Sequence, residues 1–595
     1  MMLTACASAL AGSGHRHDPP KQTPKPAYDV TSKVEAQRVD RVPAPEPNWA
    51  PCYEEWGTYE CATFPVPLDY DKPSGPQVQL ALLKHPASKP EQKIGSLFVN
   101  PGGPGAGAQG LALEMPFWFG ASVIDRFDVI GMDPRGVGGS TPIRCFNTFQ
   151  ERNAAWEGHL NPVNLPATAA EEEAEVASAR AVGKGCSSYA QPLVSSMSTA
   201  EVARDMDVLR RAVGDKKLTY WGVSYGTYLG EVYANMFPDR VRAMNLDGNI
   251  EPRAWVGNPL TKYQPMFDRL RSADGSYKAL AEILRRCAAV GQPTCKFAGG
   301  DPLAKFGKLA KRLRTETVTV KVGGYGEVPP RTLKMGYNWF VQQTRTLLAY
   351  PTGWESIDAM LASLWTLTGE GAASPSPAAK SSARRALGRS LTQTYRLRTP
   401  GALGAGPAAV AALTPKEEAQ EATLSFEESL RAVMCSDGLH APDASIWRLT
   451  GALADQRAPY FGRVWNYIDT PCATNTWTAH DEDAYFGPFD RRTANPVLIT
   501  ANYWDPNTNY DSGVAVWKLM PNSRLISADS WGHAAYWTAP CVENTVNQYL
   551  ITAVPPAAVT KCKGTVQPFE TAASSSRSAG SGYVPALPGN TPPWR

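Results

Sequence analysis

Hydrophobic residues fall into short continuous runs at the two ends of the chain, and a long segment with a helical period separates them. Continuous apolar runs bounded by Gly, Pro or Asn are typical of strands buried on both faces of a sheet. They occur at residues 95–100, 127–133, 218–223, 242–248, 495–501 and 524–527, the last of which we expect to be the final strand. Residues 78–83 alternate between apolar and polar and predict an early antiparallel strand.

Amphipathic helices are predicted between these strands, over residues 168–185, 199–213 and 225–237. Strands that alternate with helices at this spacing predict βαβ units of a doubly wound, mostly parallel sheet. The fold class is therefore α/β.

The strand pattern stops between residues 253 and 425, where helical segments dominate and predict a cap inserted into the core. These segments are residues 277–289, 302–314 and 331–348, and an Ala/Ser/Pro/Gly-rich stretch from 370 to 411 predicts a mobile loop. The predicted organisation is a solvated spacer at 1–47, core at 48–252, cap at 253–425, core at 426–563 and a disordered tail at 564–595.

Composition and charge exclude some classes of function. The chain has 595 residues, 43% of them hydrophobic, which is enough for a large core, and its net charge is +3. No basic stripe is present, so we expect no nucleic-acid partner. No run of 18 apolar residues predicts a membrane span. We expect a monomer.

Ten of the eleven cysteines suggest disulfides rather than a metal site, because the chain has no Cys-x-x-Cys pair. We expect no metal and no cofactor. Sequential pairing is the simplest of many connectivities, and buried free thiols are the alternative. Bridges would indicate an extracytoplasmic, secreted or envelope protein. The sequential pairs are Cys52–Cys61, Cys145–Cys186, Cys287–Cys295, Cys435–Cys472 and Cys541–Cys562.

The remaining cysteine, Cys6, follows Leu-Thr-Ala, which matches a bacterial lipobox. A secretory signal needs a basic segment and an apolar segment before the cleavage site, and only five residues precede Cys6. Either the true start lies upstream and Cys6 carries a lipid, which would be the only membrane attachment, or the match is accidental. We favour the first interpretation.

The segment Gly222-Val223-Ser224-Tyr225-Gly226 joins a predicted strand to a predicted helix. Gly-x-Ser-x-Gly in this context is the nucleophile elbow of an α/β hydrolase, where a sharp turn exposes the serine. Glycine on each side removes Cβ atoms that would collide there. The sequence therefore predicts that Ser224 is a nucleophile.

A glycine-rich loop at residues 101–107 follows the predicted strand at 95–100. Such a loop presents backbone N–H groups to a ligand. In a hydrolase it supplies one oxyanion donor, and the N–H of Tyr225 supplies the other. A phosphate loop is the alternative, but the spacing is not Gly-x-Gly-x-x-Gly and no Gly-Lys-Ser/Thr follows.

A second glycine-rich turn carries Asp133 and Arg135. We interpret these two residues as a charge-assisted pair that braces the neighbouring loops.

A histidine after the nucleophile must accept its proton, and an acid between them in the chain must orient that histidine. Three histidines follow Ser224: His440, His480 and His533. Only His533 lies in a glycine-containing turn that follows a predicted strand. Asp505 follows the strand before that one and precedes His533 by 28 residues. The predicted triad is Ser224, Asp505 and His533.

Several segments together resemble the secreted tripeptidyl and prolyl aminopeptidase branch of the α/β hydrolases of actinobacteria. They are the Asn100–Gly105 loop, Asp133-x-Arg135-Gly136-x-Gly138-x-Ser140, Gly222–Thr227, Met434–Gly438, Asp505-Pro506-x-Thr508 and Gly532-His533. The chain departs from many relatives at the Asn-Pro before the first glycine, which suits the tripeptidyl sub-branch, and at Ala534, where glycine is common.

The resemblance implies release of short peptides from a free N-terminus through an acyl-enzyme, with the N–H groups of Gly103 and Tyr225 holding the oxyanion. Short peptides are the implied substrates. The substrate ammonium would need a carboxylate, for which the candidates are Glu231, Asp247, Glu251 and Asp437.

Two other functions fit the same sequence. An esterase or lipase would share the triad and differ by an apolar pocket end. A non-catalytic envelope protein would be expected to lack a triad member, and here all three residue types are in place.

Overall fold

The computed structural model describes residues 28–160, 165–323, 330–369, 375–397 and 415–570. Cys6 and most of the predicted tail therefore lie outside the described residues, as do residues 370–374 and 398–411 of the predicted mobile loop. No helix in the described part of the chain is long and apolar enough to cross a membrane.

A ten-stranded sheet forms the centre of the molecule, with the order β1-β2-β3-β5-β4-β6-β7-β10-β11-β12. The pairs from β5 to β12 are parallel, whereas β1, β2 and β3 are antiparallel. The strands are β1 Ala50–Cys52, β2 Tyr59–Pro67, β3 Gln77–His85, β4 Gly95–Asn100, β5 Phe127–Met132, β6 Leu218–Val223, β7 Val241–Asp247, β10 Val497–Trp504, β11 Arg524–Trp531 and β12 Val559–Lys563.

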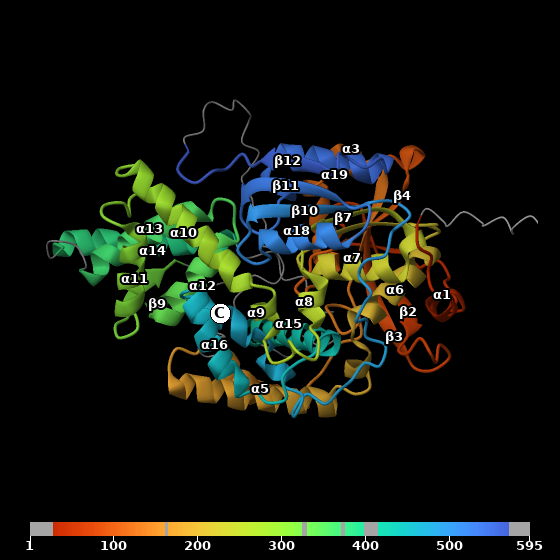
Figure 1. The fold of residues 1–595 in the computed structure, drawn as a ribbon, viewed down its shortest axis with the longest axis horizontal. Helices are drawn as coiled ribbons and strands as arrows, with labels where there is room; N and C mark the ends of the chain where they lie inside the picture. The colour runs from red at the N-terminus through yellow and green to blue at the C-terminus, as the bar shows by residue number, and fades with distance from the viewer. Residues whose placement is uncertain (1–27, 161–164, 324–329, 370–374, 398–414, 571–595) are drawn as a thin grey trace, which may run out of the picture.

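Helices cover both faces of this sheet (Figure 1). The described α-helices are α1 Lys33–Asp40, α2 Ala108–Glu114, α3 Ala121–Ile124, α4 Phe149–Leu160, α5 Ala169–Tyr189, α6 Thr199–Ala212, α7 Tyr225–Met236, α8 Pro252–Val256, α9 Met266–Arg269, α10 Ser272–Val290, α11 Pro302–Arg312, α12 Tyr337–Leu348, α13 Gly353–Thr368, α14 Pro377–Leu397, α15 Pro415–Asp437, α16 Ile446–Arg457, α17 Gly462–Asn466, α18 Tyr510–Leu519 and α19 Pro540–Thr552.

The continuous apolar runs of the sequence reflect this double cover. In β10, Val497 and Ile499 pack into the core on the side of α6, α7 and α18, and Leu498 packs into the core on the side of α2, α3 and α19. Both faces of β10 are therefore apolar, as in other covered parallel sheets. The predicted doubly wound α/β fold is confirmed.

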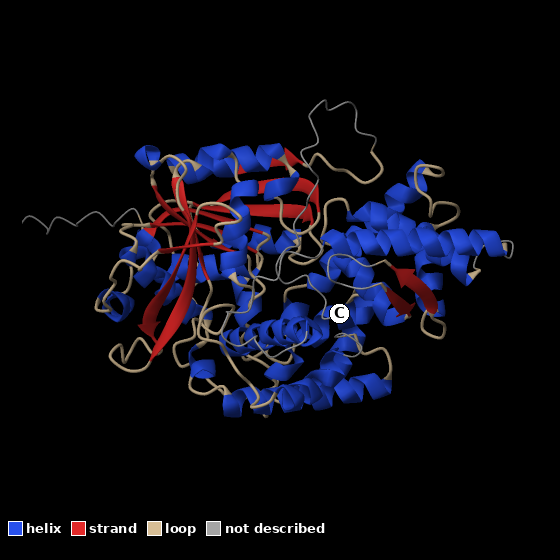
Figure 2. Cartoon of the chain, turned by 180° about the vertical axis from the view of Figure 1, so that it is seen from behind, coloured by secondary structure: helices blue, strands red, loops and turns tan. Residues whose placement is uncertain are grey.

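A helical body lies to one side of the sheet, and α11, α13 and α14 lie far from the sheet within it (Figures 1 and 2). It also contains a small hairpin of β8 Val318–Val322 and β9 Arg331–Met335. No boundary falls at residue 425, because α15 runs through it and the sheet resumes only at Val497. The cap layer also includes α5, which packs on the 3₁₀ turn Tyr467–Cys472.

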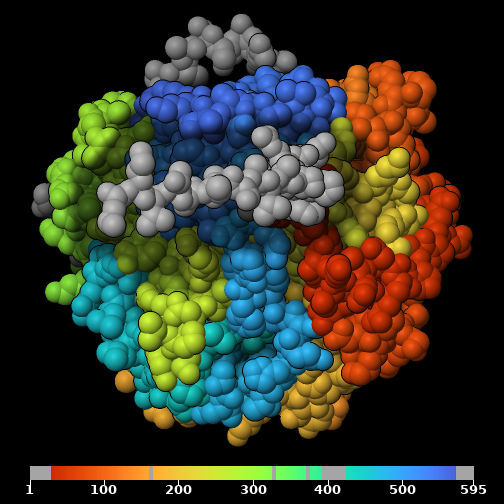
Figure 3. All heavy atoms as spheres, turned by 45° about the vertical axis from the view of Figure 1, so that its right-hand side comes forward, coloured from red at the N-terminus to blue at the C-terminus, as the bar shows by residue number. Residues whose placement is uncertain are grey.

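Four further expectations of local structure are corrected. Residues 331–335 form a strand rather than the start of a helix, β12 follows the strand that we expected to be last, and α14 occupies part of the predicted loop. Residues 28–47 are not a solvated spacer: Val39 of α1 is fully buried, and these first described residues pack against the body of the molecule (Figure 3).

Five disulfides join cysteines within the described residues, with the sequential pairing predicted above: Cys52–Cys61, Cys145–Cys186, Cys287–Cys295, Cys435–Cys472 and Cys541–Cys562.

Candidate active site

Ser224 lies on the sharp turn between β6 and α7, with φ 58° and ψ −127°. Positive φ is strained for a residue with a side chain and costs about 1–3 kcal/mol. The neighbouring glycines explain why the turn is possible. A Cβ on Gly222 would lie 2.3 Å from the carbonyl oxygen of Gly226, and a Cβ on Gly226 would lie 2.6 Å from that of Asn100. The turn exists only because both side chains are absent.

His533 and Asp505 form a buried pair. The Nδ1 atom of His533 lies 2.9 Å from Oδ2 and 3.0 Å from Oδ1 of Asp505, and both side chains are almost fully buried. An ionised carboxylate only accepts hydrogen bonds, so Nδ1 carries the proton and Nε2 is left as a base. This tautomer is the one that a nucleophilic serine requires.

Further contacts hold the Asp505 carboxylate in place. It accepts hydrogen bonds from the backbone N–H of Asn507, Thr508 and Ala534, and from the Thr508 hydroxyl at 3.1 Å. The Thr508 Oγ1 atom also lies 3.4 Å from His533 Nδ1. Sequence reasoning placed Thr508 in a motif but gave it no role. The sequence signal for its role was a hydroxyl residue three positions after the predicted acid, where it can donate to the carboxylate.

The sheet brings these residues together, because β6, β7, β10 and β11 are consecutive parallel strands. Ser224, Asp505 and His533 each follow the carboxyl end of one of them, so all three lie at one edge of the sheet. Active sites of open α/β sheets form at this edge.

The glycine loop after β4 lies directly against the elbow. A Cβ on Gly102 would lie 2.7 Å from the backbone nitrogen of Tyr225 and 3.0 Å from the Cβ of Ser224. Tyr225 N is also at the N-terminus of α7, where the helix dipole favours negative charge. Gly103, the other predicted donor, is the next residue of the loop.

Helix α15 covers this loop from the cap side. A Cβ on Gly103 would lie 3.3 Å from the ring of Phe426, and the Ser429 hydroxyl donates to the carbonyl of Gly136 at 2.7 Å. The opposite side of α15 is tied down by Glu428, which receives two hydrogen bonds from Arg152 of α4. Sequence reasoning missed this helix as part of the site, because nothing in the sequence connects residue 426 with residue 103.

The predicted amine-binding carboxylates have other surroundings. Glu251 caps α8 by accepting from Ala254 N and pairs with Arg253. Asp437 is buried and accepts from Thr199 and from Trp255 Nε1, and burial raises its pKa to about 7.

Glu231 is fully buried in α7, and burial, together with the nearby charge of Glu251, raises its pKa well above its ordinary value. Of the four candidates, Asp247 contacts the chain next to His533, through the backbone N–H of Ala535 and Tyr536.

The predicted pair of Asp133 with Arg135 does not form. Arg135 pairs with Asp205 and Glu201 of α6, whereas Asp133 accepts from Gln109 and from the N–H of Gly139. Both residues brace loops near the site, as expected, but with different partners.

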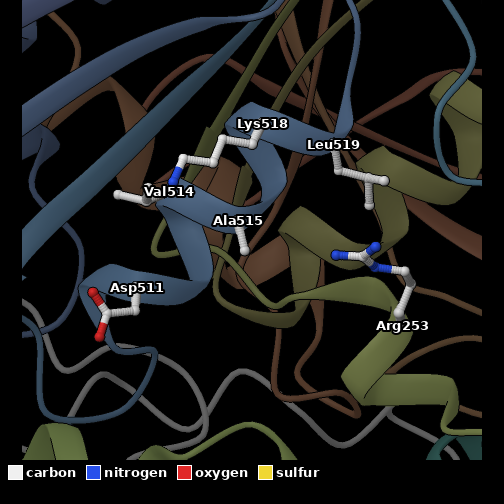
Figure 4. A pocket seen from close by; sticks show the side chains of 6 residues that line it. All are labelled: Arg253, Asp511, Val514, Ala515, Lys518 and Leu519. Carbon is white, nitrogen blue, oxygen red and sulfur yellow. The ribbon is translucent and has the colours of Figure 1, made fainter.

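A cavity of about 440 Å³ lies between α8 and α18 (Figure 4). Its lining includes Arg253 and Lys518, but no member of the predicted triad. The Arg253 guanidinium already pairs with Glu251. We assign no function to this cavity.

Comparisons with known proteins agree with this fold. The α/β hydrolase fold family matches residues 95–310, and the TAP-like protein family matches residues 458–562. A tripeptidyl aminopeptidase of Streptomyces lividans is 27% identical over 92% of this chain and 90% of its own. Serine protease Hip1 of Mycobacterium tuberculosis is 37% identical over 40% of this chain and 45% of its own. Carboxylesterase B of Mycobacterium tuberculosis is 28% identical over 88% of this chain and 91% of its own.

With this fold, this edge of the sheet and these matches, the protein is an enzyme of the α/β-hydrolase superfamily. Its sequence is similar to those of tripeptidyl aminopeptidases, and its C-terminal region matches the TAP-like protein family, in agreement with the resemblance of the motifs.

Proposed function

We propose that the protein is a serine exo-peptidase that releases tripeptides or other short peptides from substrates with a free N-terminus. The observation that carries the proposal is the buried hydrogen bond between His533 and Asp505, at the edge of the sheet where the strained Ser224 turn also lies. The similarity to a tripeptidyl aminopeptidase over nine-tenths of both chains supports the choice of peptides.

In this mechanism the Ser224 hydroxyl oxygen attacks the scissile carbonyl carbon, and His533 Nε2 takes the hydroxyl proton. The N–H groups of Gly103 and Tyr225 stabilise the resulting oxyanion. The tetrahedral intermediate then collapses: the C–N bond breaks, and His533 returns the proton to the leaving amine. Water, deprotonated by His533, hydrolyses the acyl-enzyme in the same way. Asp505 holds the imidazole in the required tautomer throughout.

The five disulfides support an oxidising, extracytoplasmic site of action. The helical body and α15 are proposed to select the substrate, since Phe426 lies against the glycine loop.

A second candidate is an esterase, which the similarity to Carboxylesterase B favours. A panel of chromogenic substrates separates the two: free-amine tripeptides, acetylated tripeptides, prolyl amides and short-chain esters. We expect the highest kcat/KM for a free-amine tripeptide. A preference for esters or for acetylated peptides would overturn the exo-peptidase proposal.

The nucleophile is tested separately by labelling with a fluorophosphonate. Ser224→Ala should lose both the label and the activity, whereas the exposed Ser74→Ala should keep both. A labelled and active Ser224→Ala variant would overturn the mechanism.

A further inference from the structure

A second carboxylate, Asp247, lies at the centre of the site and has no role in the triad. It is the last residue of β7, between the strands that end at Ser224 and at Asp505, and it is fully buried. In β6 its register partner is Val223, and in β10 it is Thr500.

Asp247 holds the elbow and the histidine loop at the same time. Its backbone carbonyl accepts from the N–H of Ser224 at 3.0 Å. Its carboxylate accepts from the N–H of Ala535 at 2.9 Å and of Tyr536 at 2.8 Å. The nucleophile and the residues next to His533 are thus attached to one residue.

The end of β7 also passes along the edge of the His533 ring. A Cβ on Gly248, the residue after Asp247, would lie 3.2 Å from Cε1 of His533 and 3.5 Å from Oδ2 of Asp505. The imidazole therefore has Asp505 at Nδ1 and the end of β7 beside Cε1. The charged or titratable groups around Asp247 are Asp505, His533 and the hydroxyl of Tyr536.

The charge of Asp247 changes near neutral pH. Burial raises its pKa to about 7, hydrogen bonds from Tyr536 and Ala535 oppose that rise, and the Asp505 charge adds to it. Two ionised carboxylates close together are unfavourable while the imidazole is neutral. A positive imidazolium relieves that repulsion, and His533 becomes an imidazolium when it takes the serine proton.

We propose that Asp247 is a second acidic positioning residue of the site, which fixes the His533 loop and, when ionised, stabilises the imidazolium formed during acyl transfer. This inference rests on the proposed triad. In this proposal Asp247 acts on His533 during the reaction, and it does not bind the substrate amine as the sequence had suggested.

The test compares wild type with Asp247→Asn, which keeps the size of the side chain and removes its charge. The ratio of their kcat values is measured between pH 5.5 and 8.5 on a peptide and on an ester substrate. Protonated Asp247 is neutral like asparagine, so we expect a constant ratio at low pH. Above pH 7 the ratio of the wild-type kcat to the variant kcat should rise by about tenfold. This is the effect expected if ionised Asp247 raises the pKa of His533 in the reacting state by about one unit.

Glu114→Gln is the matched control. Burial raises the pKa of Glu114 to about 7 as well, but this residue is at the far end of α2 from the glycine loop. We expect its ratio to wild type to be independent of pH. A thermal unfolding scan of each variant checks that the fold is kept.

The outcomes separate the two proposals. A ratio for Asp247→Asn that does not change with pH, while Ser224→Ala is inactive, would show a purely structural role and overturn this inference alone. A fully active Ser224→Ala would overturn the triad and, with it, the role of Asp247.

Discussion

The fully buried guanidinium of Arg135 donates to the fully buried carboxylate of Asp205 through two hydrogen bonds, Nε to Oδ2 at 2.9 Å and Nη2 to Oδ1 at 2.7 Å. It also donates to the backbone carbonyls of Pro67 and Leu68. One side chain thus connects the turn after β5, the end of β2 and helix α6.

Replacing Arg135 by Met should strongly destabilise the fold, because it removes the guanidinium that balances the buried Asp205 charge and leaves the Tyr70 hydroxyl as a donor. The expected loss in the free energy of unfolding is about 3–5 kcal/mol, measured by denaturant unfolding. Lys72→Met breaks an exposed pair with Asp69 and should have no measurable effect. Equal stability of the two variants would contradict this role of Arg135.

Replacing Asp505 by Asn should lower kcat by about 10⁴-fold, because an amide can hold the imidazole in the wrong tautomer. KM should change little, since Asp505 is buried behind His533. The measurement is steady-state kinetics on the best peptide of the panel. Asp511→Asn, an exposed change in the nearby α18, is the control and should retain full activity. A retained kcat in Asp505→Asn would assign the acid elsewhere.

Thr508→Val should lower kcat by about 3–10-fold, because it removes one hydrogen bond to the Asp505 carboxylate. Thr508→Ser retains the hydroxyl and should restore most of the activity. Single-turnover acylation rates of the two variants measure the effect on the chemical step. Retained activity in Thr508→Val together with a loss in Thr508→Ser would indicate that the methyl group matters rather than the hydroxyl.

Gly102→Ala should reduce kcat by at least about 100-fold, the typical effect of losing one oxyanion donor. The added Cβ would meet Tyr225 N and the Val223 carbonyl, and φ at Gly102 is 92°. Gly110→Ala is the matched control, since nothing lies within 4 Å of its Cβ position in α2. The control should keep its activity and gain slightly in stability. An active Gly102→Ala would show that the loop is not part of the oxyanion hole.

Glu114→Gln should stabilise the protein at pH 8 but not at pH 4. Burial raises the pKa of Glu114 to about 7 in the folded state, so ionisation costs stability as the pH rises from about 4.5 to about 7. Glutamine stays neutral and avoids a cost of about 3 kcal/mol, because each unit of the rise in pKa corresponds to about 1.4 kcal/mol. Melting temperatures of wild type and variant at both pH values measure the gain in stability, with the exposed Glu91→Gln as control. A gain of the same size at pH 4 would point to packing instead of charge.

The parallel strands and the contact of Asp505 with His533 were predictable because each depends on a local signal. Continuous apolar runs mark strands that are covered on both faces, and the residues that follow such strands meet at one edge. The pairing of cysteines also followed the simplest order. These signals can be read from the sequence without knowing how the elements pack.

What could not be predicted depends on contacts between distant segments. Strand β12 was missed because Val559–Lys563 is a charged edge strand with only Cys562 buried. Residues 331–335 carry no signal that separates a strand from the first turn of the following helix. The partner of Arg135 is 70 residues away in Asp205, whereas the nearby Asp133 points to other groups.

Helix α15 has a consequence for engineering. Phe426 and Ser429 lie against the glycine loop on the cap side, while Glu428 on the same helix accepts hydrogen bonds from Arg152 of α4. The cap therefore cannot be exchanged as an independent module, because α15 belongs both to the cap and to the surroundings of the glycine loop. A chimera that imports a relative's cap together with α15 would also import its oxyanion support. A graft confined to α10–α14 would keep α15 native but would still alter the surroundings of the triad candidates, because the Ala349 carbonyl accepts from the N–H of His533.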